Sequence, residues 1–129
     1  MNFGQKMQSK EQNKLKGNLG EQRAAELLKR KGYHIIATQW KSLRFEIDII
    51  AEKGNEIVFV EVKTRTSEEY GQPWEAVKRD KRRKICNSAD QYIRMNKCDK
   101  EPRFDIISII QTQEKTKITH LKSAFRPTL

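Results

Sequence analysis

Cysteine and long hydrophobic runs are scarce in this chain, and each scarcity excludes a class of protein. The two cysteines among its 129 residues, Cys86 and Cys98, match neither a zinc-binding spacing nor a disulfide framework, so we expect two reduced thiols. No apolar run is longer than four residues (57–60), whereas a membrane-spanning helix needs about 20. The first residues also lack the apolar stretch of a signal peptide, so we expect a cytoplasmic protein without membrane contact.

Acidic side chains are in the minority, which sets the electrostatic character of the chain. Lys and Arg number 27 against 17 Asp and Glu, so the formal net charge at pH 7 is +10. Such an excess favours anionic partners, either nucleic acid or an anionic membrane surface. Because no apolar segment is available to insert into a bilayer, nucleic acid is the partner that the composition favours.

The remaining composition supports one small domain. Hydrophobic residues make up 36% of the chain, and a chain of this length buries roughly two-thirds of its unfolded surface. Apolar periodicity is confined to the middle of the sequence. We therefore expect a flexible basic lead-in over 1–16, a single domain over 17–125 and a C-terminal tail over 126–129.

Hydrophobic periodicity predicts two helices and five strands. The helices are expected at 18–31 and 73–95, and the strands at 33–40, 45–52, 56–64, 104–111 and 117–121. The step from the third strand through the second helix to the fourth strand requires a parallel crossover, whereas the second and third strands form an antiparallel hairpin. The expected fold is α/β, with a mixed central sheet of about five strands flanked by helices in the order αβββαββ.

The first predicted helix places a carboxylate beside its apolar stripe. Asn18 is a cap candidate, Glu21 completes a capping box three positions later, and Gly32 ends the helix. At ~100° per residue, Glu21 projects close to the direction of Leu28. Glu21 is therefore either a residue that complements the helix dipole or a carboxylate directed toward a site at the sheet.

The predicted hairpin sets two acids opposite each other. If Gly54 and Asn55 are the whole turn, Asp48 lies opposite Glu61. Opposed carboxylates repel, and a divalent cation would offset that repulsion. Phe59 lies on the same strand face as Glu61, which indicates partial burial and favours the metal interpretation.

A lysine belongs to the same predicted face. The hairpin register sets Glu46 opposite Lys63, two residues beyond Glu61. The structural alternative is that Glu46 and Lys63 form a surface ion pair and that Asp48 and Glu61 are merely solvated. Phe45, on the other strand face, is expected to point away from the acids.

The second predicted helix combines an apolar stripe with a basic run. Six of the seven residues at 78–84 are cations. Lys81 lies in the centre of the stripe, so it either extends along apolar neighbours or directs its ammonium toward the carboxylates. Arg79, Arg82 and Arg83 project outward and could contact phosphates, and Arg65, directly after the third strand, is the stronger candidate for such a contact. The predicted stripe consists of Trp74, Val77, Ile85, Ser88, Tyr92 and Met95.

The histidines and tryptophans carry weaker signals. His34 and His120 have no partner at ligand spacing, so each is expected to be a half-buried strand residue. Trp40 and Trp74 could stack on bases, but packing in a strand and a helix is the simpler interpretation.

Taken together, these motifs resemble a known family. Asp48 followed by Glu61, Val62 and Lys63 is similar to the D…(D/E)-x-K pattern of PD-(D/E)xK nucleases, which have the restriction-endonuclease-like fold. The chain resembles the UPF0102, or YraN-like, family still more closely, over roughly residues 17–125. The segments that carry this resemblance are GNLGE with Ala24, EIDII at 46–50, FVEVKTR at 59–65, GQP at 71–73, RFD at 103–105 and AF at 124–125. The chain departs from the family pattern at Phe45, where Gly is usual.

The resemblance implies a metal-dependent nuclease site. Asp48 and Glu61 would bind Mg²⁺ or Mn²⁺, together with the Val62 carbonyl. Lys63 would orient or activate the attacking water, and Glu21 would bind the metal directly or through water. Phosphodiester hydrolysis needs an activated water and neutralisation of a highly charged transition state, which a bound divalent ion supplies.

Three functions follow from this sequence. The first is a metal-dependent endonuclease acting on DNA, including branched or damaged DNA, and the second is a non-catalytic nucleic-acid-binding module of the same fold. The third is a basic interaction domain for RNA or ribosomes without a metal site. Nucleases of this fold that cut two strands are often dimers, so the resemblance leaves a homodimer open.

Overall fold

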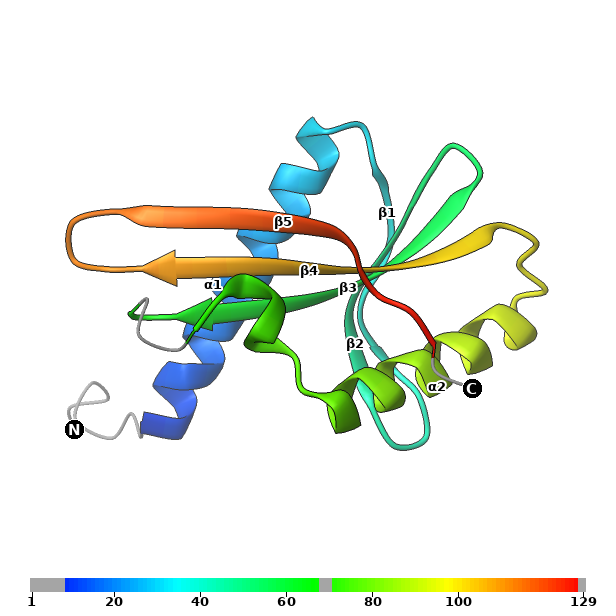
Figure 1. Ribbon diagram of the computed structural model, residues 1–129, viewed down its shortest axis with the longest axis horizontal. Helices are drawn as coiled ribbons and strands as arrows, with labels where there is room; N and C mark the ends of the chain where they lie inside the picture. The colour runs from blue at the N-terminus through cyan, green and yellow to red at the C-terminus, as the bar shows by residue number, and fades with distance from the viewer. Residues whose placement is uncertain (1–8, 68–70, 128–129) are drawn as a thin grey trace, which may run out of the picture.

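The protein is an α/β domain built on a five-stranded sheet (Figure 1). The computed structural model describes residues 9–67 and 71–127, and the side chains in these ranges except those of 9–18 and 76. The strand order is β1-β2-β3-β4-β5, and all neighbours are antiparallel except β3 and β4, which are parallel. This confirms the predicted mixed sheet and the order αβββαββ. The elements are α1 (Ser9–Arg30), β1 (His34–Lys41), β2 (Glu46–Lys53), β3 (Glu56–Arg65), the 3₁₀-helix η3 (Pro73–Ala76), α2 (Arg79–Met95), β4 (Glu101–Gln111) and β5 (Thr116–Phe125).

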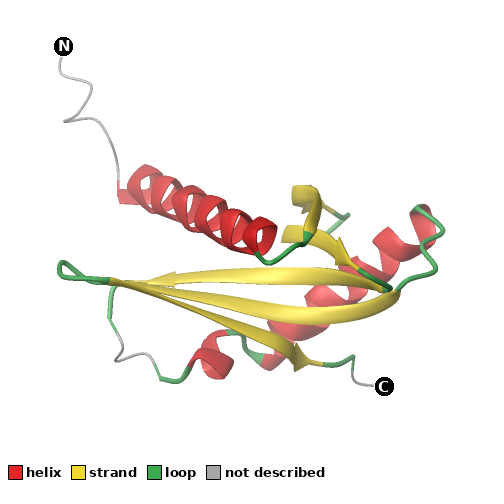
Figure 2. Ribbon diagram, turned by 90° about the horizontal axis from the view of Figure 1, so that it is seen from above, coloured by secondary structure: helices red, strands yellow, loops and turns green. Residues whose placement is uncertain are grey.

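The helices cover opposite faces of the sheet. Figure 2 shows α1 over one face, with η3 and α2 over the other. Leu28 of α1 packs with Ile49 and Val60, whereas Ile85 of α2 packs with Phe59. Both faces of β3 and β4 are therefore buried, which explains why these strands have nearly continuous apolar runs.

The β2–β3 hairpin has the predicted register near its turn. Gly54 takes a φ of 59° at the first turn position, where glycine is unstrained, and the pairs from Lys53↔Glu56 to Ile49↔Val60 are the predicted ones. The ladder ends at Ile49 and Val60.

Beyond that point the hairpin differs from the prediction. No ion pair joins Glu46 to Lys63 among the described residues. In the sheet, the strand neighbour of Glu46 is Lys41 of β1. Ile47 packs under α2, not on the face of Ile49 where strict alternation had placed it. The physical reason is that the Asp48 side chain accepts the Val62 N–H at 2.8 Å and replaces the backbone ladder there.

The first helix is longer than predicted. It begins at Ser9, so residues 9–16 of the expected flexible lead-in are helical and Asn18 lies inside the helix, where it is not the cap. Residues 1–8 lie outside the described chain. The predicted end is confirmed: Gly32 has a φ of 90°, and the Tyr33 N–H returns to the Leu28 carbonyl at 2.9 Å.

The second predicted helix is interrupted. Val77 and Lys78 are extended and separate η3 from α2. Arg82 satisfies the carbonyls freed by this break, donating from Nε to Val77 O at 2.7 Å and from Nη2 to Trp74 O at 2.8 Å. Because of the break, Trp74 is 54% exposed, and Met95 at the far end of α2 is 66% exposed. Neither belongs to the core, although the four residues between them in the predicted stripe are buried.

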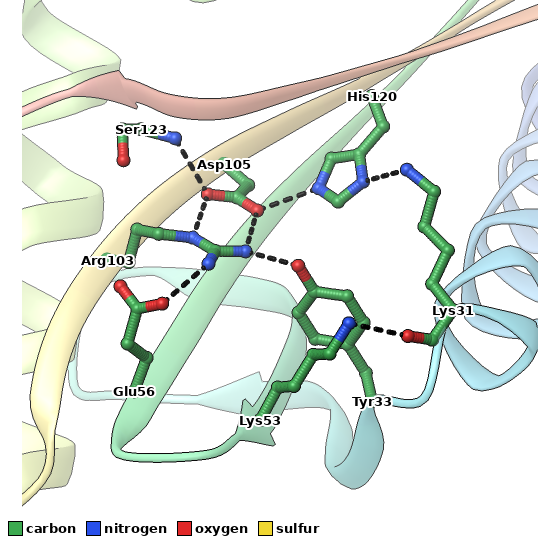
Figure 3. A network of polar contacts seen from close by, with 8 residues as sticks. All are labelled: Lys31, Tyr33, Lys53, Glu56, Arg103, Asp105, His120 and Ser123. Atoms are coloured by element: carbon green, nitrogen blue, oxygen red, sulfur yellow. Dashed lines mark hydrogen bonds and ion pairs between the residues drawn. The ribbon is translucent and has the colours of Figure 1, made fainter.

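A buried polar network lies on β4 and β5 (Figure 3). Its centre is the fully buried Asp105, which accepts two hydrogen bonds from Arg103, at 2.9 and 2.8 Å. Asp105 also accepts the Ser123 N–H at 3.0 Å and faces His120 Nε2 at 2.7 Å. Burial alone would raise the pKa of Asp105, but these hydrogen bonds outweigh burial and lower its pKa.

The network extends to the end of α1. Arg103 donates to the Tyr33 hydroxyl at 2.6 Å and pairs with Glu56 at 2.9 Å. Lys31 lies 2.8 Å from His120 Nδ1. Because an ammonium only donates, Nδ1 is the acceptor and the ring proton resides on Nε2, facing Asp105. His120 is thus a structural strand residue that is half-buried as a whole, as predicted, with its side chain the more deeply buried part.

In the part of the chain that the structure describes, no helix is both long and apolar enough to cross a membrane. Cys86 and Cys98 are both free thiols, as predicted.

Candidate active site

Two acidic residues meet where β2 separates from β3. Glu61 continues the face of Phe59 toward α2 and is only 4% exposed. Asp48 is half-buried and is held by its hydrogen bond from Val62 N–H. The two carboxyl groups are close enough for each to influence the charge of the other. The structure therefore brings Asp48 and Glu61 together at the end of the ladder, by a side-chain hydrogen bond rather than by direct strand pairing.

Lys81 of α2 reaches the same point. Its Nζ lies 2.5 Å from Glu61 Oε1, so its ammonium points to the carboxylates, which was one of the two interpretations left open by the sequence. The other carboxylate oxygen, Glu61 Oε2, is buried and has no hydrogen-bond partner among the described residues. A buried oxygen without a donor is costly unless a proton or a cation completes its surroundings.

Glu21 approaches from the opposite face of the sheet. The neighbouring Gly20 packs so closely on β3 that a Cβ at this position would overlap Thr64 Oγ1. This close approach brings Glu21 within hydrogen-bonding reach of Asp48. Gln39 donates from Nε2 to Glu21 Oε2 at 3.0 Å and orients the carboxylate.

Gln39 is a site residue that the sequence did not reveal. It has a φ of 51°, in the left-handed region that is unfavourable for residues other than glycine. Its side chain links β1 to Glu21, so the strained backbone contributes to the geometry of the site. A glutamine in a strand gives no sequence signal for this role, because the contact depends on how α1 is placed over β1.

Burial and mutual repulsion perturb the protonation of the acids. Burial is the largest cause for both Asp48 and Glu61, and it raises the pKa of Asp48 to about 6 and that of Glu61 to about 7. The charge of Glu21 adds to the shift at Asp48, and the charge of Asp48 adds to the shift at Glu61. Burial also raises the pKa of Glu21. The positive charge near these three acids is therefore too small to offset their burial and their mutual repulsion.

The two lysines respond in opposite directions. Burial and the charge of Lys81 lower the pKa of Lys63. Burial, the largest single cause, opposes the charge of Lys81 as well, but the hydrogen bond to Glu61 and the charges of Glu61 and Asp48 together outweigh burial and raise the pKa of Lys81. Because its pKa is raised, Lys81 stays protonated and partly neutralises the acids. Lys63 is a half-buried ammonium beside them.

The donor set can be compared with what a divalent ion requires. No group of three or more His, Cys, Asp or Glu side chains within the described ranges is arranged to hold a metal ion by itself. Mg²⁺, however, commonly takes one or two carboxylates and completes its shell with water and substrate phosphates. Asp48, Glu61 and the Val62 carbonyl match that requirement, and the unpartnered Glu61 Oε2 offers a free ligand atom.

The remaining predicted cations lie around this cluster. Arg65 ends β3, and its charge contributes to the lowered pKa of Lys63. Arg79 and Arg83 are exposed on α2, as predicted. Arg82 does not project freely outward, because its guanidinium binds the carbonyls of Trp74 and Val77.

The prediction for Trp40 is confirmed, whereas the one for His34 is wrong. Trp40 packs edge-on against Tyr92 at a centroid distance of 5.3 Å, as expected for a packing residue. His34 is exposed on β1 rather than half-buried. Phe45 packs against the core under α2.

Comparison with known proteins places the chain in a family. The family model described as "Uncharacterised protein family UPF0102" matches residues 20–109. The UPF0102 protein of Flavobacterium psychrophilum is 43% identical over 109 residues, covering 84% of this chain and 92% of that protein. Those of Bacteroides thetaiotaomicron and Caldanaerobacter subterraneus are 42% and 45% identical, covering 88% and 84% of this chain and 93% of each relative. The matched region contains the whole acidic cluster together with Lys63 and Lys81, and the chain belongs to the UPF0102 family.

Proposed function

We propose that this protein is a metal-dependent endonuclease that hydrolyses phosphodiester bonds in DNA, with Mg²⁺ or Mn²⁺ as its cofactor. The observation that carries the proposal is the pair of adjacent acids, Asp48 and Glu61, with raised pKa values and an unpartnered buried oxygen. Perturbed acids grouped beside lysines are typical of catalytic sites. The resemblance to PD-(D/E)xK nucleases, carried by Asp48, Glu61 and Lys63, supports the same reaction.

Each residue of the site has a role that follows from its position. Asp48, Glu61 and the Val62 carbonyl would hold the ion, which supplies an activated water and neutralises charge on the phosphate. Glu21, oriented by Gln39, completes the outer side of the site. Lys63 lies beside the acids with a lowered pKa, which suits an ammonium that orients the attacking water.

Lys81 has a distinct role in this proposal. In the structure its ammonium neutralises Glu61, so it occupies a position where positive charge is needed. Its stem is half-buried and its head comes from a different element than the acids, so it can turn toward a substrate phosphate without disturbing the sheet. We assign it to phosphate contact during the reaction.

A second candidate is a non-catalytic nucleic-acid-binding module. The observation that favours it is the same Lys81–Glu61 pair, because a lysine at 2.5 Å already offsets part of the acidic charge. Such a module would not need Asp48, and it would bind DNA equally well with or without a divalent ion.

A cleavage assay separates these two functions. Linear, flapped and four-way DNA are incubated with Mg²⁺ or Mn²⁺ and with wild type, Asp48→Ala or Lys63→Ala. Glu114→Ala, which removes an exposed acid in the turn between β4 and β5, serves as the control. We expect cleavage by wild type and by the control, and loss of at least about 100-fold in the two site variants.

The opposite results are equally clear. DNA binding by wild type without any cleavage favours the binding module. Cleavage that persists in both Asp48→Ala and Lys63→Ala comes from elsewhere and contradicts the site assignment.

A further inference from the structure

A groove on the flank of α2 has no part in the acidic cluster. It has a volume of about 620 Å³ and lies between α2 and the end of the chain beyond β5. Figure 1 shows this end of the chain descending from β5 to α2. None of the acids or lysines assigned above lines the groove. Four arginines do: Arg79, Arg82, Arg83 and Arg126.

Three of these arginines are available to a ligand. Arg79, Arg83 and Arg126 are exposed, and within the described part of the chain none of them has a hydrogen bond or ion pair. Asp90 is the one acid that lines the groove among the described residues, and it is paired with Arg94 at 3.1 Å. The groove is therefore strongly positive and its charge is not balanced from within.

The fourth arginine and the apolar lining give the groove a fixed shape. Two backbone carbonyls hold the Arg82 guanidinium, which lies over the Phe125 ring at 5.5 Å from its centroid. Ile93 and Pro102 add apolar surface beside Phe125. The Phe125 ring is itself buried and also stacks on Phe104, so the Arg82 guanidinium, with Ile93 and Pro102 beside it, is the surface on which a nucleobase can stack.

The geometry points to an unpaired nucleic-acid strand as the occupant of this groove. Phosphates would meet the three free arginines, and bases would contact the apolar lining. A duplex hides its base faces, so it could use the charge but not the apolar lining. The inference rests on the proposed function and extends it, because it assigns to the endonuclease a substrate with a single-stranded arm.

Continuity with the acidic cluster favours nucleic acid over an acidic peptide. Lys81, which reaches Glu61, lies two residues from Arg79 and two from Arg83 in the first turns of α2. Because side chains two residues apart project to opposite sides of a helix, a phosphate chain that reached both the acids and the groove would pass around the first turn of α2. A peptide that bound the groove would have no corresponding reason to lie beside a phosphodiester-cleaving site.

The two free thiols provide a direct test. Cys86 lines the groove, whereas Cys98 does not, and both are half-buried in the same core region. Alkylation of each thiol is followed by mass spectrometry on the full chain, without divalent metal, with a short oligothymidylate, a blunt duplex of equal length, or neither. We expect a saturating concentration of the single strand to slow alkylation of Cys86 by roughly tenfold, because bases seated in the groove cover the thiol. Alkylation of Cys98 should be unchanged.

Variants add a second, independent measurement. Arg83→Ala and Arg126→Ala should each reduce the slope of log affinity against log salt for the single strand by about 0.7. Lys84→Ala removes an exposed cation of the same helix that does not line the groove, and it should leave the Cys86 protection intact. Cys86→Phe fills the groove without changing charge and should weaken the single strand more than the duplex.

Several results would overturn the inference. These are equal alkylation of Cys86 with and without the single strand, equal protection by the duplex, or equal protection by an acidic peptide or by free thymidine monophosphate. Because no metal is present and no cleavage is measured, these outcomes are independent of whether the acids catalyse hydrolysis. If the protein cleaves DNA but the single strand does not protect Cys86, the assignment of the groove is wrong and the proposed function stands. If the single strand protects Cys86 but the protein does not cleave DNA, the proposed function is wrong and the assignment of the groove stands.

Discussion

At the scale of single residues, the account depends on how charge is balanced around Glu61. Its carboxylate is almost fully buried and has one cationic partner, Lys81. The other oxygen is unsatisfied. A buried carboxylate in this state binds whichever positive species is available, so Lys81 and a divalent ion compete for it.

This competition predicts an unusual effect of Lys81→Ala. Without the ammonium, Glu61 should bind Mn²⁺ roughly tenfold more tightly in the absence of DNA, because one competitor is removed, while cleavage of DNA should fall. Isothermal titration of metal-free protein measures the affinity, and Lys84→Ala controls for loss of charge on α2. Weaker Mn²⁺ binding in Lys81→Ala would show that the lysine supports the ion rather than competing with it.

The same charge imbalance predicts that Asp48→Asn stabilises the fold. Burial and neighbouring acids raise the pKa of Asp48 to about 6, so its charge opposes folding at neutral pH, while asparagine still offers an oxygen to the Val62 N–H. Urea unfolding at pH 7 should show a gain of about 1–2 kcal/mol. Glu52→Gln in the same strand is the control, since Lys100 lowers the pKa of Glu52 and no gain is expected there. Destabilisation by Asp48→Asn would contradict this view of the site.

Some residues of the site could be predicted from sequence and others could not. That Asp48 and Glu61 lie near each other follows from the two-residue turn, which is local, although the direct pairing predicted from strict alternation does not form. The direction of Lys81 follows from helix geometry. Gln39 depends on a strained backbone and on the placement of α1, which are tertiary features. The hydrogen bond from Val62 to Asp48 depends on the end of a ladder that alternation alone would have continued.

At the scale of elements, the position of α1 on β3 is set by Gly20. A Cβ there would overlap Thr64 Oγ1, and threonine in a strand has little freedom to rotate away. Without that overlap, alanine would be the better helix residue by about 1 kcal/mol.

Gly20→Ala should therefore have opposite effects in two backgrounds. In wild type it should cost about 1–2 kcal/mol and displace Glu21 from the site, because the clash exceeds the helix-propensity gain. In a Thr64→Ala background it should stabilise the protein instead. Urea unfolding of the four proteins of the cycle gives both values, and a stabilising effect in wild type would show that the contact is easily relieved.

The interruption between η3 and α2 shows a limit of sequence reading at this scale. Apolar spacing from Trp74 to Met95 suits one continuous helix, and nothing local signals extended backbone at Val77. The break persists because the Arg82 side chain satisfies the freed carbonyls and packs over Phe125 at the far end of the chain. Such a contact between distant segments is visible only in the folded protein.

At the scale of the whole molecule, the buried network around Asp105 joins α1, β4 and β5. His120, Arg103 and the Ser123 N–H outweigh burial and lower the pKa of Asp105 below its unfolded value. The folded state therefore binds fewer protons than the unfolded state in acid. The stabilisation is complete above the unfolded pKa and is lost as pH falls through it toward the folded pKa.

Acid unfolding should depend on this one carboxylate. Wild-type stability should decline below about pH 4. Asp105→Asn should be less stable at pH 7 by about 3 kcal/mol, because it leaves Arg103 without its buried partner, and should lose less on acidification. Urea unfolding at pH 7 and pH 3 measures both effects, and an unchanged acid slope in Asp105→Asn would assign acid sensitivity to other groups.

Equilibrium binding of Mn²⁺, followed by electron paramagnetic resonance, measures whether Asp48 and Glu61 together hold one divalent ion. We expect one bound ion per wild-type chain, and loss of that ion in both Asp48→Ala and Glu61→Ala but not in Glu114→Ala. Absence of Mn²⁺ binding by the wild type, or binding that survives both site substitutions, would contradict it.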